Sequence, residues 1–175
     1  MTGPAALRTE RLVLRPSTPE LARAEIADRA RFAALLGAEV PAAWPPEELA
    51  PALGILLARL EAEPAACGWF AWYALAPREE APPVLVGSAG FTGPPRQGEV
   101  EIGYSVMPEF QRRGYATEMV RALSRRALAQ DGVTRVTART EWANPASVRV
   151  LEKAGFHACG PRDEAGGARF EVHRC

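Results

Sequence analysis

Residues 99–116, EVEIGYSVMPEFQRRGYA, decide the fold of this chain. Residues 99–107 alternate polar and apolar side chains as a half-buried strand does, and a helix is expected to begin near Tyr115. Between them, Gly114 lets the backbone approach a ligand closely, and the N-terminus of a helix favours negative charge. This order of strand, turn and helix predicts an anion-binding site. Neither the P-loop pattern nor the dinucleotide pattern GxGxxG occurs in this stretch.

Strand and helix patterns alternate on both sides of this stretch. Further strands are predicted at 11–15, 68–76, 84–91 and 133–139, and helices at 18–37, around 49–60, at 115–132 and at 144–155. Pro51 must kink the second helix or start it. The last residues, with Gly166-Gly167 as a turn, predict a hairpin. Since there is no repeat, linker or low-complexity tract, we expect residues 1–175 to form a single mixed α/β domain.

The composition limits the classes of partner. The 175 residues are 47% hydrophobic and 24% charged, which is typical of a soluble globular protein. Lys+Arg and Asp+Glu both number 21, so the chain has no basic excess to hold a nucleic acid, and it has no stretch apolar enough to span a membrane. We therefore expect no nucleic acid and no membrane partner. Residues 111–153 hold 9 basic and 4 acidic side chains, which indicates either an anionic ligand or a solvated helix face.

The cysteines and histidines do not form a recognisable metal pattern. Cys67, Cys159 and Cys175 include no CxxC pair and no neighbouring histidine spaced like a zinc ligand. We therefore expect no disulfide framework, no metal and a reducing, cytoplasmic location. His157 and His173 flank the predicted last hairpin, and both are interpreted as structural.

Three segments in combination resemble a known family. The segments EIGYSV, QRRGYA and, about 30 residues later, NPASVRVLEKAGF are similar to the GNAT superfamily of acyl-CoA-dependent N-acyltransferases. Within it, the opening LRTERLVLRP and the NPAS segment look like the ribosomal-protein N-acetyltransferase (Rim-type) branch, although residues 38–83 match poorly. The resemblance implies a mixed sheet of about six to seven strands with four main helices, in which a splayed parallel strand pair binds coenzyme A.

The resemblance also implies acetyl-CoA as co-substrate and assigns residues to it. Tyr104, Ser105 and Val106 would pair with the pantetheine arm and offer a backbone N–H to the thioester oxygen. Asn144, which its neighbour Pro145 marks as a helix N-cap, would also contact the coenzyme. The backbone amides of the QRRGYA segment would hold the pyrophosphate: Gln111, Arg112, Arg113, Gly114, Tyr115 and Ala116.

Two glutamates are candidates for proton transfer and acceptor contact. Glu101 lies where many members of the superfamily place a general base. By the period of two, Glu99, Glu101, Gly103 and Ser105 share one face of the strand, so two carboxylates line up beside a gap for a ligand. Glu99 is a candidate substrate contact. Cross-strand polar contacts are the alternative for both glutamates.

The position at which the family places the acid for the departing thiolate differs in this sequence. In many relatives it is a tyrosine four residues before the terminal Gly-Phe, but that position is Leu151 in this sequence. Ser147 is the nearest substitute, unless it is merely solvated. A thiolate with a conjugate-acid pKa near ~8.5 can also leave without a dedicated donor. Trp44 lies in a loop that borders the acceptor pocket in this fold, where it contacts substrate or fills the core.

The sequence thus predicts an acetyl-CoA-dependent N-acetyltransferase that works by direct transfer in a ternary complex, without a cysteine intermediate. The expected acceptor is a protein or peptide N-terminal α-amine. A small-molecule amine or an antibiotic is the alternative within the same class, and a non-catalytic acyl-CoA-binding protein is the alternative outside it. The sequence leaves open the acceptor, the acyl chain length and whether the protein forms a homodimer.

Overall fold

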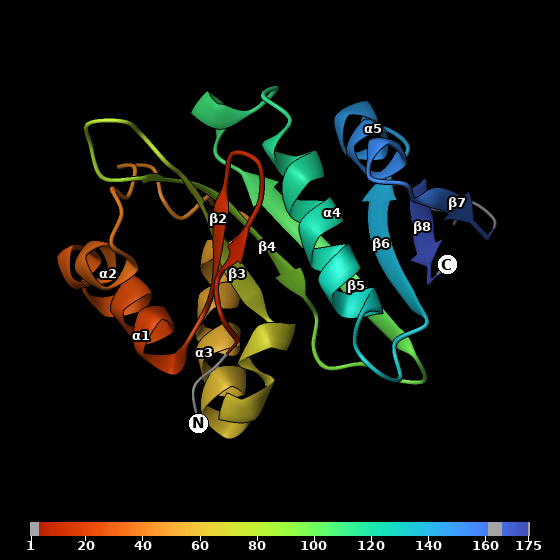
Figure 1. Ribbon diagram of the computed structural model, residues 1–175, viewed down its shortest axis with the longest axis horizontal. Helices are drawn as coiled ribbons and strands as arrows, with labels where there is room; N and C mark the ends of the chain where they lie inside the picture. Colours follow the sequence, from red (N-terminus) through yellow and green to blue (C-terminus); the bar gives the residue numbers. More distant parts are fainter. Residues whose placement is uncertain (1–3, 161–165, 175) are drawn as a thin grey trace.

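The computed structural model of the protein describes residues 4–160 and 166–174. These residues form an eight-stranded mixed sheet in the order β1-β2-β3-β4-β5-β6-β8-β7 (Figure 1). The predicted mixed sheet is confirmed, and the short strands β1 and β7 add to its width. The strands are β1 (Leu7–Arg8), β2 (Val13–Pro16), β3 (Ala71–Ala76), β4 (Val84–Phe91), β5 (Glu99–Val106), β6 (Arg135–Glu141), β7 (His157–Cys159) and β8 (Gly167–His173).

The described α-helices are α1 (Pro19–Ala27), α2 (Arg29–Leu36), α3 (Leu53–Ala62), α4 (Tyr115–Leu128) and α5 (Pro145–Lys153). The prediction of a single helix over 18–37 is wrong, because the helical conformation is interrupted at Asp28. This residue is extended, and its side chain accepts a hydrogen bond from the backbone N–H of Arg31, so it caps a second helix. Gly37 ends α2 in the left-handed conformation with φ 64°.

Smaller differences occur at the ends of other elements. Pro51 lies in a 3-10 turn, Ala50–Ala52, that leads into α3, so it starts the helix rather than kinking it. Residues Pro64–Trp69 form another 3-10 segment, and the strand predicted from residue 68 therefore begins at Ala71. The predicted last hairpin is confirmed by the pairing of β7 with β8. Residues 161–165, which come between the two strands in the sequence, lie outside the described residues. Of the predicted Gly166-Gly167 turn, Gly167 already belongs to β8.

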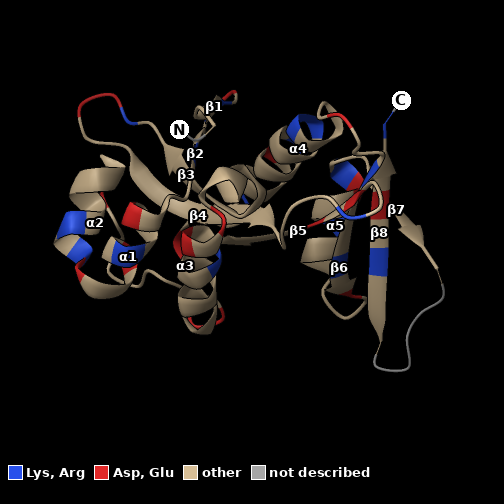
Figure 2. Cartoon of the chain, turned by 90° about the horizontal axis from the view of Figure 1, so that it is seen from below, with Lys and Arg blue, Asp and Glu red and all other residues tan. Residues whose placement is uncertain are grey.

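Helices cover both faces of the sheet (Figure 2). On one face, Met119, Val120 and Leu123 of α4 are fully buried and pack in one cluster with β5 residues such as Ile102. On the other face, α1 and α2 pack on side chains such as Tyr73 of β3, and α3 packs beside them. In the described part of the chain, no helix combines the length and apolar character needed to cross a membrane.

Strand β5 changes neighbours along its length. Residues Glu99–Glu101 pair in parallel with Arg135–Thr137 of β6, whereas residues 102–106 pair with β4 in antiparallel fashion. The parallel strands therefore part after three residue pairs, and the second half of β5 keeps a backbone edge that faces the gap. This confirms the expected splayed parallel pair, and it places the gap beside the first turn of α4.

Candidate active site

The segment Gln111–Ala116 leads from β5 into α4: residues 111–114 follow a short 3-10 turn, Pro108–Phe110, and Tyr115 and Ala116 are the first residues of α4. Gly114 is the N-cap residue of α4 with φ 84°, and no side chain caps this helix. The first amides of a helix lack intrahelical acceptors, so an uncapped N-terminus with the positive end of the helix dipole suits a phosphate group. Gln111 donates from Nε2 to the carbonyl of Val106 at 3.0 Å, which ties the turn to the end of β5.

A residue that sequence reasoning missed holds this turn from the other side. Arg11, in the connection between β1 and β2, donates to the carbonyl of Arg113 at 2.7 Å, and its guanidinium lies over the ring of Tyr115. Glu118 of α4 in turn binds the Arg11 guanidinium at 2.8 Å and accepts the Thr9 hydroxyl at 2.6 Å. Burial alone would raise the pKa of Glu118, but the Thr9 and Arg11 hydrogen bonds bring it below its ordinary value. The chain's N-terminal turn is thus fixed to the candidate phosphate site.

Two hydroxyl groups meet between β5 and α5. The Tyr104 hydroxyl lies 2.7 Å from Ser147 Oγ, and Asn144 Oδ1 accepts the backbone N–H of Ser147 at 3.1 Å. Asn144 is therefore the N-cap of α5, as its sequence predicts. Burial raises the pKa of Tyr104, so the phenol stays protonated and can donate. Leu151 is fully buried in the core.

The two glutamates of β5 both make cross-strand ion pairs. Glu99 contacts Arg135 at 2.7 Å and Arg169 at 2.6 Å, and it accepts the Thr137 hydroxyl at 3.2 Å. Burial alone would raise the pKa of Glu99, but these three groups lower it. Glu101 has one such contact, with Arg139 Nε at 3.1 Å. The Glu99 carboxylate is thus held by two arginines, whereas the Glu101 carboxylate has a single arginine partner.

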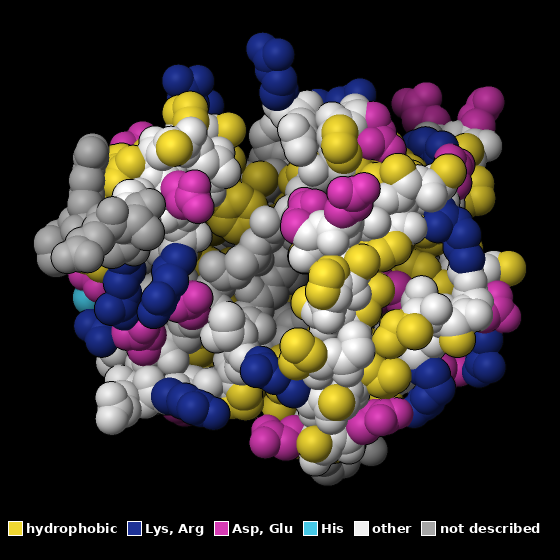
Figure 3. Space-filling view, turned by 180° about the vertical axis from the view of Figure 1, so that it is seen from behind, with side chains coloured by type: hydrophobic (Ala, Val, Ile, Leu, Met, Phe, Trp, Pro, Cys, Tyr) yellow, Lys and Arg dark blue, Asp and Glu magenta, His cyan; other side chains and the backbone are white. Residues whose placement is uncertain are grey.

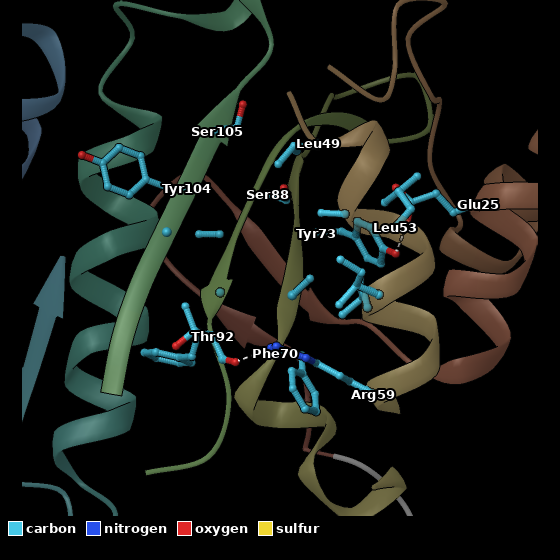
Figure 4. A pocket seen from close by; sticks show the side chains of 18 of the residues that line it. Glu25, Leu49, Leu53, Arg59, Phe70, Tyr73, Ser88, Thr92, Tyr104 and Ser105 are labelled. Carbon is cyan, nitrogen blue, oxygen red and sulfur yellow. Dashed lines mark hydrogen bonds between the residues drawn. The ribbon is translucent and has the colours of Figure 1, made fainter. Parts of the chain in front are cut away.

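A cavity of about 350 Å³ lies on the face of the sheet covered by α3 (Figure 4). Its floor is a row of side chains in register across three strands, namely Tyr73, Ser88 and Ser105. Gly103 widens the floor next to this row, since a Cβ built on it would meet no atom within 4 Å. Tyr104 points to the opposite side of β5 from Ser105 (Figure 4). Ser105 donates to Glu48 at 3.1 Å, a carboxylate from the loop before α3 that sequence reasoning missed.

A half-buried carboxylate lines the cavity beside the predicted Trp44. Glu25 of α1 accepts the indole N–H of Trp44 at 2.8 Å and the hydroxyl of Tyr73 at 2.6 Å. Burial raises the pKa of Glu25, and the two hydrogen bonds offset part of this effect. Burial and the neighbouring Glu25 raise the pKa of Tyr73 well above its ordinary value. Trp44 is 5% exposed, so it packs in the core and borders the cavity at once.

Glu99 and Glu101 border a second cavity of about 730 Å³. The two cavities share three lining residues, Arg59, Phe70 and Thr92, and are therefore adjacent. Seen from behind, the molecule is hollowed between the hydrophobic side chains over α3 and a group of charged side chains farther along the sheet (Figure 3). Glu101 and the cavity floor thus belong to one recessed region.

A comparison with known protein families matches most of this chain. The family model for an acetyltransferase (GNAT) domain matches residues 11–157. The chain belongs to this family. Its domain is thus that of an acyltransferase, and the GNAT resemblance predicted from the segments EIGYSV, QRRGYA and NPASVRVLEKAGF is confirmed.

Individual relatives support the family without fixing the acceptor. The uncharacterized N-acetyltransferase YjdG of Bacillus subtilis is 41% identical over 73 residues, which cover 41% of this chain and 44% of YjdG, so the match spans less than half of that relative. The structure of the ribosomal-protein-S5-alanine acetyltransferase of Vibrio fischeri superimposes with a TM-score of 0.65 at 18% identity, covering 98% of this chain and 97% of that one. The aminoglycoside acetyltransferase AAC(6')-Ib, in complex with ribostamycin and coenzyme A, gives 0.56 at 20% identity and 94% coverage of both chains.

Proposed function

We propose that this GNAT domain transfers an acetyl group from acetyl-CoA to a primary amine by direct attack in a ternary complex. The observation that carries the proposal is the parting of β5 from β6 after three residue pairs, directly beside the uncapped N-terminus of α4. The pyrophosphate is assigned to the amides of residues 111–116. The pantetheine arm and the thioester oxygen are assigned to the free edge of β5 at Tyr104, Ser105 and Val106.

The chemistry needs a base and a route for one proton to the leaving group. The amine nitrogen attacks the thioester carbonyl carbon, the C–N bond forms and the C–S bond breaks. In the proposal Glu101 takes the amine proton, directly or through a water, and the thiolate is protonated by Ser147 with its partner Tyr104 or by solvent. Neither Cys67 nor Cys159 lines either cavity, which supports transfer without a cysteine intermediate.

The smaller cavity is assigned to the acceptor. Among the described residues its lining is mostly apolar and includes one acidic side chain, Glu25, which is already bound to Trp44 and Tyr73. A polycationic aminoglycoside would need several carboxylates, so this lining favours an acceptor with an apolar group next to its amine. We therefore propose a protein or peptide N-terminal α-amine followed by an apolar side chain, in a reducing, cytoplasmic setting, where Trp44 contacts that side chain. Glu99 would act at the edge of this region by holding Arg135 and Arg169.

A kinetic comparison of acceptors tests the proposal. Thiol release is followed with acetyl-CoA and short peptides with apolar or acidic first residues, a polyamine and an aminoglycoside. The highest kcat/KM is expected for peptides with apolar first residues. A preference for the aminoglycoside would contradict the acceptor assignment. Tight acetyl-CoA binding without thiol release for any acceptor would instead favour a non-catalytic acyl-CoA-binding protein.

A further inference from the structure

The sequence contains two histidines, and the fold brings both to one carboxylate. His157 lies on β7, whereas Glu171 and His173 lie on β8. His157 and Glu171 are register partners, and His173 follows two residues after Glu171, so all three side chains leave the same face of the sheet. Their assembly depends on strand pairing and not on sequence spacing, which explains why no metal pattern was visible in the sequence.

The distances are those of a ligand set. Nε2 of His157 lies 3.5 Å and Nε2 of His173 lies 3.1 Å from the same oxygen, Glu171 Oε1. One ligand atom from each of the three residues lies within 4.8 Å of the others. A zinc ion with bonds of about 2.0–2.1 Å keeps its ligand atoms about 3.4 Å apart in a tetrahedral site. The two imidazole rings are nearly parallel, with centroids 5.8 Å apart, so both side chains have to rotate from this stacked arrangement to direct their Nε2 atoms at one ion.

We propose that His157, Glu171 and His173 form a binding site for a divalent transition-metal ion, with Zn²⁺ as the expected occupant. Two imidazoles and one carboxylate are a known zinc ligand set, whereas Mg²⁺ and Ca²⁺ prefer oxygen ligands alone. The partial exposure of the three side chains gives the ion a path of entry and leaves room for water as a further ligand.

The site is separate from the proposed acetyl-transfer region. Glu101, Thr137 and Glu171 are in register across β5, β6 and β8, which puts the backbone of Glu171 roughly 10 Å from that of Glu101. None of the three ligands lines either cavity. The nearest cations of the same face, Arg135 and Arg169, are both paired with Glu99. A zinc ion here would join the edge strand β7 to β8 and take no part in the chemistry.

The experiment uses the untagged full chain after treatment with a chelator. Calorimetric titration with ZnCl₂ should give one site per chain, and MgCl₂ and CaCl₂ should give none. NMR resolves the only two imidazoles in the protein, and both should shift together on zinc addition. Zinc should also raise the unfolding temperature, because an ion that binds the folded chain alone stabilises it.

Single substitutions then identify the ligands. His157→Gln, His173→Gln and Glu171→Gln should each weaken zinc binding by about tenfold or more, with unfolding temperatures near wild type in the absence of zinc. Glu152→Gln, an exposed carboxylate on α5, is the matched control for Glu171, and Cys159→Ser tests the neighbouring thiol; both should bind zinc like wild type. No zinc binding by the wild type would overturn the proposal. Binding that survives in the double histidine variant, or that is lost with Cys159→Ser, would overturn it as well.

Discussion

Glu101 and Glu99 are two residues apart on one face of β5 and differ in the number of arginines that bind them. We expect Glu101→Gln to keep wild-type acetyl-CoA affinity and to lower kcat by ~10² or more at pH 7, since the amide cannot accept a proton. The lost rate should return partly as pH rises. It should return further with an α-amine acceptor than with a lysine, because the α-amine titrates about 2.6 units lower.

Glu99→Gln is the matched control, because it makes the same chemical change on the same strand face. Its kcat should stay near wild type while its stability falls, since Arg135 and Arg169 lose their carboxylate partner. Steady-state kinetics from pH 6 to pH 9 checks both variants. Wild-type turnover of the Glu101 variant at pH 7 would remove Glu101 from the proposed mechanism.

The paired hydroxyl groups of Ser147 and Tyr104 can also be tested by single substitutions. Ser147→Ala and Tyr104→Phe should each lower kcat by less than about tenfold, because a thiolate is a good leaving group and each variant retains one hydroxyl. Single-turnover kinetics with normal far-UV circular dichroism as the fold control checks this. A thousandfold loss in a folded Ser147 variant would make this hydroxyl an essential acid.

Elements that rest on local signals could be predicted from the sequence, and contacts between distant segments could not. The turn at Gly114 and the cap at Asn144 are encoded within a few residues, and both are where the sequence places them. The break at Asp28 was missed because apolar periodicity runs through it. Glu25 meets Tyr73 from 48 positions away, and Glu48 meets Ser105 from 57 positions away. No pattern along the sequence predicts contacts between residues so far apart.

The turn before α4 allows a test of the phosphate assignment. Gly114→Val should weaken acetyl-CoA binding more than Arg112→Ala does. A valine at φ 84° is strained, and its Cβ would lie 3.1 Å from Arg11 Nη2, whereas one exposed arginine is replaceable. Calorimetric titration gives both affinities, and thermal unfolding shows whether the valine variant is folded. Equal affinities of wild type and a folded Gly114→Val would contradict the assignment.

The link from α4 to the N-terminal turn should be visible in the pH dependence of stability. The lowered pKa of Glu118 means that its contribution is fully present above the ordinary value of 4.5 and is lost as pH falls through the lower folded pKa. Glu118→Gln should therefore reduce stability at pH 7, and the difference from wild type should shrink below pH 4.5. Urea unfolding at a series of pH values measures this difference. A difference independent of pH would show that the carboxylate charge is not what holds Arg11.

At the scale of the whole molecule, the cavity proposed for the acceptor lies between α3 and a part of the sheet that includes the small residues Ser88, Gly103 and Ser105. Gly103→Val should fill part of this space, since a Cβ there meets nothing within 4 Å and the strand tolerates valine. We expect a lower kcat/KM for peptide acceptors and an unchanged acetyl-CoA affinity. Gly54→Ala on α3 also adds a Cβ in open space and serves as the control. Unchanged acceptor kinetics in the Gly103 variant would place the acceptor elsewhere.

The change of neighbours along β5 makes this strand the one seam between two slabs of sheet, β1 to β4 on one side and β6, β8 and β7 on the other. Helix α4 contacts strands of both slabs and so acts as a brace across the seam (Figure 1). The buried side chains of α4, Met119 and Leu123 among them, therefore separate the two parts of the sheet by their packing. If the acyl group binds in the gap beside β5 as proposed, we expect substitutions at these core positions to change the acyl-chain length that the domain accepts, although neither side chain lines either cavity.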